Sequence, residues 1–153
     1  MISLCCLGLQ VPAAQAGNAH FQTIVLPTAS NRPIKVNGQL GGSFSLHSIA
    51  NTDRSNNACL GFSYADVPDY ILSVEQQLNS LTVRVESRDT QQDTTLLIDG
   101  PTGLYCADDT DAFNQDARVS MTNIQRGEYR VWVGYMPAPT PPRSTRYFLW
   151  LEP

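Results

Sequence analysis

Apolar and polar residues alternate along most of the chain from residue 70 onward. In the segment 70–74 the alternation places Tyr70, Leu72 and Val74 on one side. A period of two residues is typical of β-strands that have one face in the core and one toward solvent. Similar alternation in 81–87, 127–135 and 146–152 gives the remaining core-facing residues: Leu81, Val83, Val85, Tyr129, Val131, Val133, Tyr135, Tyr147, Leu149 and Leu151.

Weaker strand patterns precede these, at 21–26, 34–40 and 43–49. Gly38 and the pair Gly41-Gly42 are interpreted as turns or bulges between or within them. No segment shows an apolar stripe with helical spacing. Many short strands separated by turn signals predict an all-β fold, an antiparallel β-sandwich or jelly-roll-like domain. Its longer connections are a polar segment at 51–68 and a Pro-rich segment at 136–145.

The first sixteen residues form a short apolar run that ends in Ala14-Gln15-Ala16. Small residues spaced in this way are typical of the cleavage site of a secretory signal peptide, although the usual positive charge at its start is missing. We expect cleavage after Ala16, a secreted or periplasmic location, and a single domain over residues 17–153. The apolar run is too short to span a bilayer.

The overall charge narrows the choice of partners. The 153 residues carry a formal net charge of -4, and their basic residues are scattered without a basic run. Such a chain has no general attraction for a phosphate backbone, so nucleic acid is not an expected partner.

Two cysteines, Cys59 and Cys106, remain after the expected cleavage. In an oxidising compartment a lone pair of cysteines most simply forms a disulfide. The alternative is two buried free thiols. Neither cysteine has the spacing of a metal-binding CxxC motif.

An acidic region lies between Arg88 and Arg118, with no other basic residue inside it. Loops rich in carboxylate and amide oxygens suit Ca²⁺, which takes six to eight oxygen ligands. The expected calcium ligands are Asp108, Asp109, Asp111 and Asp116, with Asp99 as a neighbour; Asp89 and Asp93 are the other acids of the region. The spacing does not fit an EF-hand. The alternative is that these residues only build turns by accepting hydrogen bonds from nearby backbone amides.

The sequence offers little for catalysis. Adjacent aspartates in one loop lack the separation and the different environments that a pair of catalytic carboxylates needs. No GxSxG motif is present, and the two histidines, His20 and His47, are isolated in the sequence. We therefore expect a protein that is not an enzyme.

Aromatic residues occupy the other face of the last two predicted strands. Trp132, Phe148 and Trp150 alternate with the core-facing positions, and Arg130 and Arg146 flank them. If these strands are neighbours, the five residues form one surface that binds a sugar or peptide. The alternative is that residues 21–26 cover the patch.

The strand sequences resemble those of the bacterial pre-peptidase C-terminal domain. The similar parts are the strand and turn from Asp93 to Gly103, the Asp108-Asp109 pair, and the Gly-x-Tyr-x-Val-x-Val strand from Gly127 to Val133. The resemblance covers roughly residues 68–152. It implies a secreted, non-catalytic, jelly-roll-like β-sandwich; some members assist substrate binding or secretion, and some that accompany collagenases bind calcium and a polymeric substrate.

Two features differ from the family pattern. These 153 residues include no protease domain, and the cysteine pair would join the polar connection to the acidic loop. The expected function is a secreted accessory or binding module that recognises an extracellular polymer, glycan or protein, and that calcium stabilises. The alternative is a structural or protein-interaction subunit of the cell envelope, or a protease-associated regulator.

Overall fold

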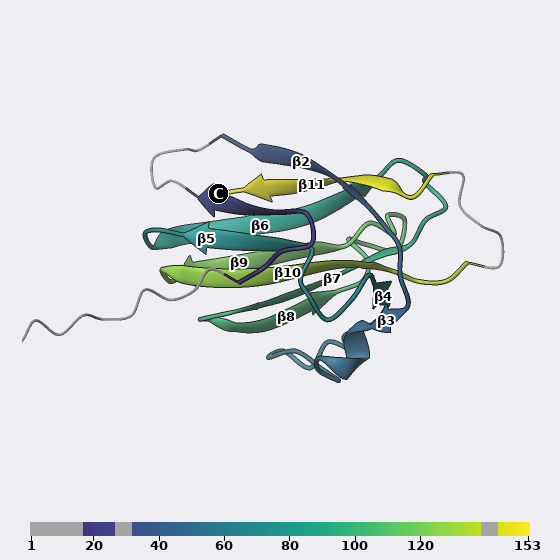
Figure 1. Cartoon of the computed structure of the whole chain (residues 1–153), viewed down its shortest axis with the longest axis horizontal. Helices are drawn as coiled ribbons and strands as arrows, with labels where there is room; N and C mark the ends of the chain where they lie inside the picture. Colours follow the sequence, from purple (N-terminus) through teal and green to yellow (C-terminus); the bar gives the residue numbers. More distant parts are fainter. Residues whose placement is uncertain (1–16, 27–31, 139–143) are drawn as a thin grey trace, which may run out of the picture.

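The chain forms two β-sheets that pack face to face (Figure 1). The computed structural model describes residues 17–26, 32–138 and 144–153. The expected signal peptide, 1–16, and the centre of the Pro-rich connection, 139–143, lie outside the described residues. The expectation of a β-sandwich stapled by one disulfide is confirmed.

One sheet has seven strands and the other has four. The seven-stranded sheet contains β1 (Gln22–Leu26), β3 (Phe44–Ser45), β4 (Phe62–Ser63), β5 (Tyr70–Val74), β7 (Thr94–Gly100), β8 (Gly103–Ala107) and β10 (Gly127–Tyr135). The four-stranded sheet contains β2 (Ile34–Gln39), β11 (Arg146–Glu152), β6 (Leu78–Ser87) and β9 (Arg118–Ile124), in that spatial order. A single 3₁₀ turn, η1 (Leu46–Ser48), follows β3 among the described residues.

β10 is the central strand of the seven-stranded sheet. Its residues Gly127–Val131 pair with β5 on one side, and Arg130–Tyr135 pair with β7 on the other. β8 continues the sheet beyond β7, and β1 continues it beyond β5. The β1–β5 pairing is parallel, whereas the other strand pairs of the described chain are antiparallel.

The core between the sheets confirms the alternation seen in the sequence. The residues predicted to face the core in 70–74, 81–87, 127–135 and 146–152 are at most 2 % exposed, except Tyr135, which is half-buried and packs against the edge of the core. Tyr70 and Tyr147 meet inside the core, where the Tyr147 hydroxyl donates to the Tyr70 hydroxyl at 3.2 Å and the latter donates to the carbonyl of Asn37 at 3.1 Å. The buried phenols therefore have polar partners.

A second apolar cluster lies on the outer side of the seven-stranded sheet. It contains Leu46 of η1, Leu97, Trp132 and the disulfide, and the connection between β3 and β4 covers it. Cys59 and Cys106 are bonded, with their Cα atoms 5.2 Å apart. The disulfide thus fixes this connection onto β8. No helix in the described parts of the chain has the length and apolar character needed to cross a membrane.

Candidate functional site

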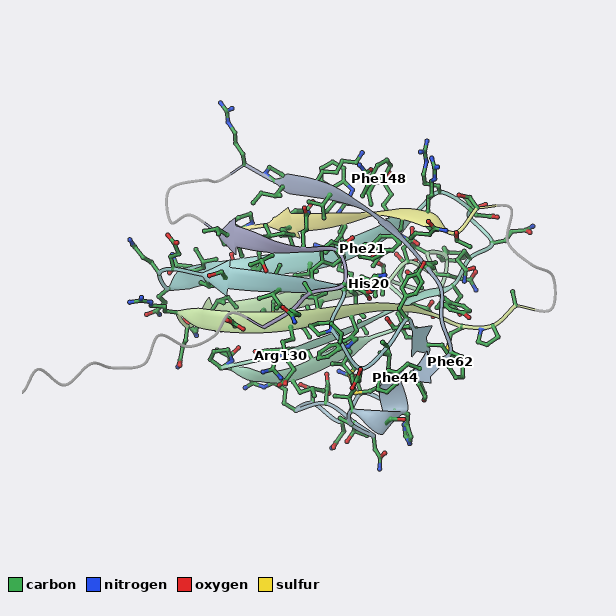
Figure 2. The ribbon with its side chains drawn as sticks, in the orientation of Figure 1. His20, Phe21, Phe44, Phe62, Arg130 and Phe148 are labelled. Carbon is green, nitrogen blue, oxygen red and sulfur yellow. A yellow bond between two sulfur atoms is a disulfide. The ribbon has the colours of Figure 1, made fainter. Side chains whose placement is uncertain are left out.

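The structure separates the aromatic residues that the sequence pattern grouped. β10 and β11 belong to different sheets, so the expectation that they are neighbours sharing one aromatic patch is wrong. Trp132 is in the seven-stranded sheet, whereas Phe148 and Trp150 are in the four-stranded sheet. In Figure 2 Phe148 lies beside β2 at the upper edge of the view, while Arg130 lies in the lower half.

Trp132 is a core residue of the second apolar cluster. Its side chain is only 3 % exposed, and its indole Nε1 donates to the carbonyl of Asp66 at 3.2 Å. The expected cover, residues 21–26, lies elsewhere: it forms the edge strand β1 and sends Ile24 and Leu26 into the main core. The connection around η1 buries Trp132 instead.

The outer side of the four-stranded sheet carries a stack of aromatic rings and cations, here called the cation–aromatic face: Lys35, Arg84, Arg88, Phe148 and Trp150. The Lys35 ammonium lies 3.6 Å from the Phe148 ring centre and 4.6 Å from that of Trp150. Trp150 pairs in register with Lys35 of β2 on one side and with Arg84 of β6 on the other. The Arg84 guanidinium is 4.7 Å from Trp150, and that of Arg88 is 5.4 Å from Phe148. Cation–π attraction therefore links three adjacent strands across this face.

Two carboxylates hold part of this arrangement in place. Trp150 Nε1 donates to Glu86 Oε2 at 2.6 Å. Arg84 donates through Nε to Glu152 at 3.1 Å and through Nη1 to Glu86 at 3.5 Å. Because a short charge-assisted bond fixes the indole, the orientation of Trp150 is set before any ligand arrives.

Arg146, a residue expected to bind ligand, lies beside Arg88 at the end of this face. The Arg88 backbone N–H donates to the Arg146 carbonyl at 3.1 Å. Both border a hollow of about 500 Å³ that Asn37 and Gln39 of β2 also line. The hollow thus combines two guanidinium groups with two side-chain amides, which are donors suited to an anionic oxygen ligand.

Positive charge is concentrated on this side of an acidic protein. Five of the ten Lys and Arg residues lie at outward-facing positions of the four-stranded sheet or at its margin: Lys35, Arg84, Arg88, Arg118 and Arg146. The acidic residues at such positions are Glu86, Asp116 and Glu152. The formal charge of the whole chain is -4. The rest of the molecule is correspondingly more acidic, so the sandwich is electrically polarised.

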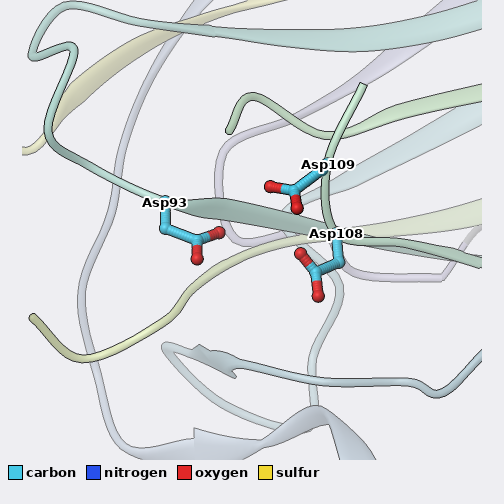
Figure 3. Close-up of side chains that lie close together, drawn as sticks. All are labelled: Asp93, Asp108 and Asp109. Atoms are coloured by element: carbon cyan, nitrogen blue, oxygen red, sulfur yellow. The ribbon is translucent and has the colours of Figure 1, made fainter. Parts of the chain in front are cut away.

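An acidic cluster forms where β7 begins and β8 ends, as Figure 3 shows. Carboxylate oxygens of Asp93, Asp108 and Asp109 lie within 4.8 Å of one another. Asp93 Oδ1 is buried and has no hydrogen-bond partner among the described residues. Burial, together with repulsion by Asp108 and Asp109, raises the pKa of Asp93 to about 6, and burial followed by Asp109 also raises the pKa of Asp108. These oxygens could hold a hard divalent cation.

Only part of the expected calcium set contributes to this cluster. Asp108 and Asp109 belong to it, and Asp93, which was not chosen, completes it. Asp111 instead accepts backbone N–H bonds from Phe113 and Asn114, at 2.8 and 3.1 Å. Asp111 therefore builds a turn by accepting hydrogen bonds from nearby backbone amides, which is the alternative to calcium binding stated above.

Asp116 and Asp99 are also placed apart from the cluster. Asp116 accepts the Ser87 backbone N–H through both oxygens, at 3.0 and 3.1 Å, and so joins β6 to the start of β9. Asp99 pairs with Leu104 near the far end of the β7–β8 hairpin. The sequence could not separate the roles of Asp108, Asp109, Asp111 and Asp116, because all four lie in one polar segment.

The histidines lie in different places. His47 is exposed in η1, and His20 stacks on Tyr64 with their ring centres 4.5 Å apart. The charge of His20 acts to lower the pKa of Asp69, a buried acid just before β5.

A polar groove of about 710 Å³ runs between β8 and β9, the last strands of the two sheets on this side. Six consecutive residues, 118–123, line it. Alternate side chains of a strand point to opposite faces, so six consecutive residues border one groove when the groove follows the backbone edge. Opposite them, the edge of β8 is partly occupied: the Arg54 N–H donates to the Leu104 carbonyl, and Asp53 accepts the Cys106 N–H.

No protein-family model matches the chain, and no curated protein matches it significantly.

Proposed function

We propose that this protein is a secreted, non-catalytic binding module that recognises an extended extracellular polymer on the outer side of its four-stranded sheet. The observation that carries the proposal is the cation–aromatic face, in which half-buried Phe148 and Trp150 are set among Lys35, Arg84 and Arg88. Aromatic and Arg side chains are the residue types that contribute most to binding surfaces.

The shape of this face favours an elongated ligand. β6 has ten residues, which at about 3.3 Å per residue gives a length of roughly 30 Å. Four strands spaced about 4.8 Å apart form a surface roughly 15 Å across. An open sheet face longer than it is wide contacts several units of a polymer at once.

The proposed setting is the periplasm or the cell exterior, after removal of residues 1–16. The Cys59–Cys106 disulfide supports an oxidising compartment. The resemblance to pre-peptidase C-terminal domains supports an accessory role beside an exported protein, and this role is part of the proposal.

A structural calcium ion is a further part of the proposal. The three carboxylates of Asp93, Asp108 and Asp109 and the unpartnered Asp93 oxygen fit a hard cation. A bound ion would neutralise the mutual repulsion of these groups and join the start of β7 to the segment after β8. The expected ligands Asp99, Asp111 and Asp116 are not included.

The test is a binding screen of the full chain against immobilised polysaccharides and matrix proteins. Trp150→Ala and Phe148→Ala should lower binding to the polymer that is retained. Arg130→Ala, an exposed residue of the opposite sheet, is the matched control and should not change binding. If the wild type retains no polymer, or if Arg130→Ala weakens binding as much as Trp150→Ala, the proposed face is wrong.

A second candidate function is a protein-interaction subunit of the cell envelope, which the groove along β9 favours. An unpaired strand edge offers a row of backbone donors and acceptors to an extended peptide. A peptide bound there would slow hydrogen exchange at the backbone amides of Arg118, Ser120 and Thr122, which alternate with the amides that pair with β6. A polymer bound to the cation–aromatic face would leave exchange at these amides unchanged.

A further inference from the structure

We propose that the polymer is an anionic polysaccharide, whose carboxylate or sulfate groups bind Lys35, Arg88 and Arg146. This inference rests on the proposed function, because it names the class of polymer that the same face holds.

Neutral sugars are disfavoured because cations already lie over the aromatic rings. A pyranose ring stacks on a bare aromatic ring, but the Lys35 ammonium lies 3.6 Å from the Phe148 ring centre. Trp150 is flanked by Lys35 and Arg84 from the two neighbouring strands. A cation stacked on a ring keeps its charge and its outward N–H groups. The face therefore presents positive donors that the rings hold in position.

Three cations on or beside this face have no carboxylate partner among the described residues. Arg84 is paired with Glu86 and Glu152, but none of Lys35, Arg88 and Arg146 forms an ion pair among the described residues. An anion that binds them does not have to displace a carboxylate of the protein. Hydrogen bonds between such groups and an anion are stronger than those between neutral groups.

The hollow beside Arg88 and Arg146 supplies the most specific contacts. Guanidinium groups match the two oxygens of a carboxylate or sulfate, and the amides of Asn37 and Gln39 in the same hollow can bind sugar hydroxyls. A carbohydrate meets both kinds of group, because it carries hydroxyls beside each acidic substituent.

An acidic peptide fits this face less well. The backbone groups of β11 and β6 are used in pairing within the sheet, so the outer surface has only side chains to offer. An extended peptide gains its main-chain hydrogen bonds at a strand edge, and the cation–aromatic face is not an edge.

The experiment measures the affinity of the full chain for four probes by biolayer interferometry, at 50 and 200 mM NaCl. The probes are heparin as a sulfated polysaccharide, polygalacturonate as a carboxylated one, dextran as a neutral one, and poly-L-glutamate as an acidic peptide. We expect heparin or polygalacturonate to bind, with an affinity that falls on the order of tenfold between the two salt concentrations, since two or three ion contacts are screened.

Variants locate the site. Arg88→Gln and Arg146→Gln should each weaken binding about tenfold, the usual effect of removing a charged hydrogen-bond donor. Arg130→Gln, which removes the same charge from the opposite sheet, should change binding less than twofold. All three residues are exposed, and an unchanged melting temperature confirms that each variant is folded.

Each other result overturns the inference in a distinct way. Equal binding of dextran and the anionic polysaccharides, insensitive to salt, would refute the anionic class but leave the proposed binding function standing. Tighter binding of poly-L-glutamate than of either anionic polysaccharide would show that the ligand is an acidic protein segment. Equal losses of affinity in Arg88→Gln and Arg130→Gln would show a general electrostatic attraction of the polysaccharide to the protein, without a defined site. If none of the four probes binds, and the screen of polysaccharides and matrix proteins also retains no polymer, both proposals are wrong.

Discussion

The carboxylate of Asp69 accepts a hydrogen bond of 2.8 Å from the backbone N–H of Val133. The same oxygen accepts the Ser63 hydroxyl at 3.0 Å, so the side chain joins β4 and β10 just before β5 begins. The other oxygen is buried without a partner among the described residues. Burial raises the pKa of Asp69 to about 6, although the bonds from Val133 and Ser63 and the charge of His20 act in the opposite direction.

This raised pKa predicts that ionisation of Asp69 destabilises the fold. An unfolded Asp has a pKa of about 3.9, so between pH 4 and pH 6 the native state holds a proton that the unfolded state has lost. Stability from this group is therefore highest at low pH and falls as pH rises to 6, by about 3 kcal/mol in total. Asp69→Asn should remove this dependence.

Chemical denaturation at pH 4.5 and pH 7.5 measures the effect. The free energy of unfolding of the wild type relative to Asp69→Asn should fall between the two pH values. Asp66→Asn, an exposed neighbour, is the control and should follow the wild type. A constant difference between wild type and Asp69→Asn across this range would contradict the prediction.

The acidic cluster predicts a stabilising effect of calcium. At pH 7.5, calcium at a hundred times its dissociation constant should stabilise the protein by about 2.7 kcal/mol, which excess EDTA reverses. Differential scanning calorimetry should show this as a rise of several degrees in melting temperature. The rise should be smaller at pH 5, where Asp93, with a pKa of about 6, is mostly protonated.

Two variants test which carboxylates are involved. Asp93→Asn should abolish the calcium effect and, without calcium, should stabilise the protein because it removes repulsion by Asp108 and Asp109. Asp99→Asn, at the far end of β7, should leave the calcium effect intact. If added calcium does not change the melting temperature of the wild type, the proposed calcium site is wrong.

The disulfide predicts a large loss of stability on reduction. Closing a loop between residues 47 apart constrains the unfolded chain by roughly 4 kcal/mol in the chain-entropy model. Cys59→Ala together with Cys106→Ala should lower the free energy of unfolding by about this amount. Mass spectrometry of an unreduced tryptic digest should find peptide 55–84 linked to peptide 89–118; recovery of both as separate peptides would disprove the bond.

The two tryptophans predict opposite phenotypes. Trp132→Ala should lower the free energy of unfolding by about 3–5 kcal/mol, because a side chain that is 3 % exposed leaves a cavity. Trp150→Ala, on the half-buried outer face, should cost less stability and lose polymer binding. Urea denaturation and the polymer assay separate the two; a fully stable Trp132→Ala would contradict its place in the core.

Side-chain alternation predicted the strands and their buried faces, because burial imposes that period on each strand separately. It did not predict which strands pair, since β10 and β11 alternate in the same way whichever sheet they join. This is why Trp132 was grouped with Trp150, and why Lys35 and Arg84 were missed. Their outward positions were readable in the sequence, but their contact with Trp150 depends on the order β2-β11-β6.

Gly38 shows a second limit of sequence reasoning. It was interpreted as a turn or bulge, but it lies within β2 opposite Tyr147. A Cβ atom there would be 2.1 Å from Cζ of the Tyr147 ring, so the glycine makes room for an aromatic side chain of a distant strand. Asp93 was likewise passed over because its partners Asp108 and Asp109 come from the end of the adjacent strand.

The pairing of β2 with β11 determines when this fold can be completed. β2 begins at Ile34, yet its one strand partner in the described chain is β11, which begins more than a hundred residues later at Arg146. A chain that emerges from a ribosome or a translocation channel from its N-terminus thus cannot close the four-stranded sheet until β11 is out. Contacts so distant in sequence form slowly. A protein exported as an unfolded chain would benefit from this delay, because it would remain competent for translocation until it had crossed.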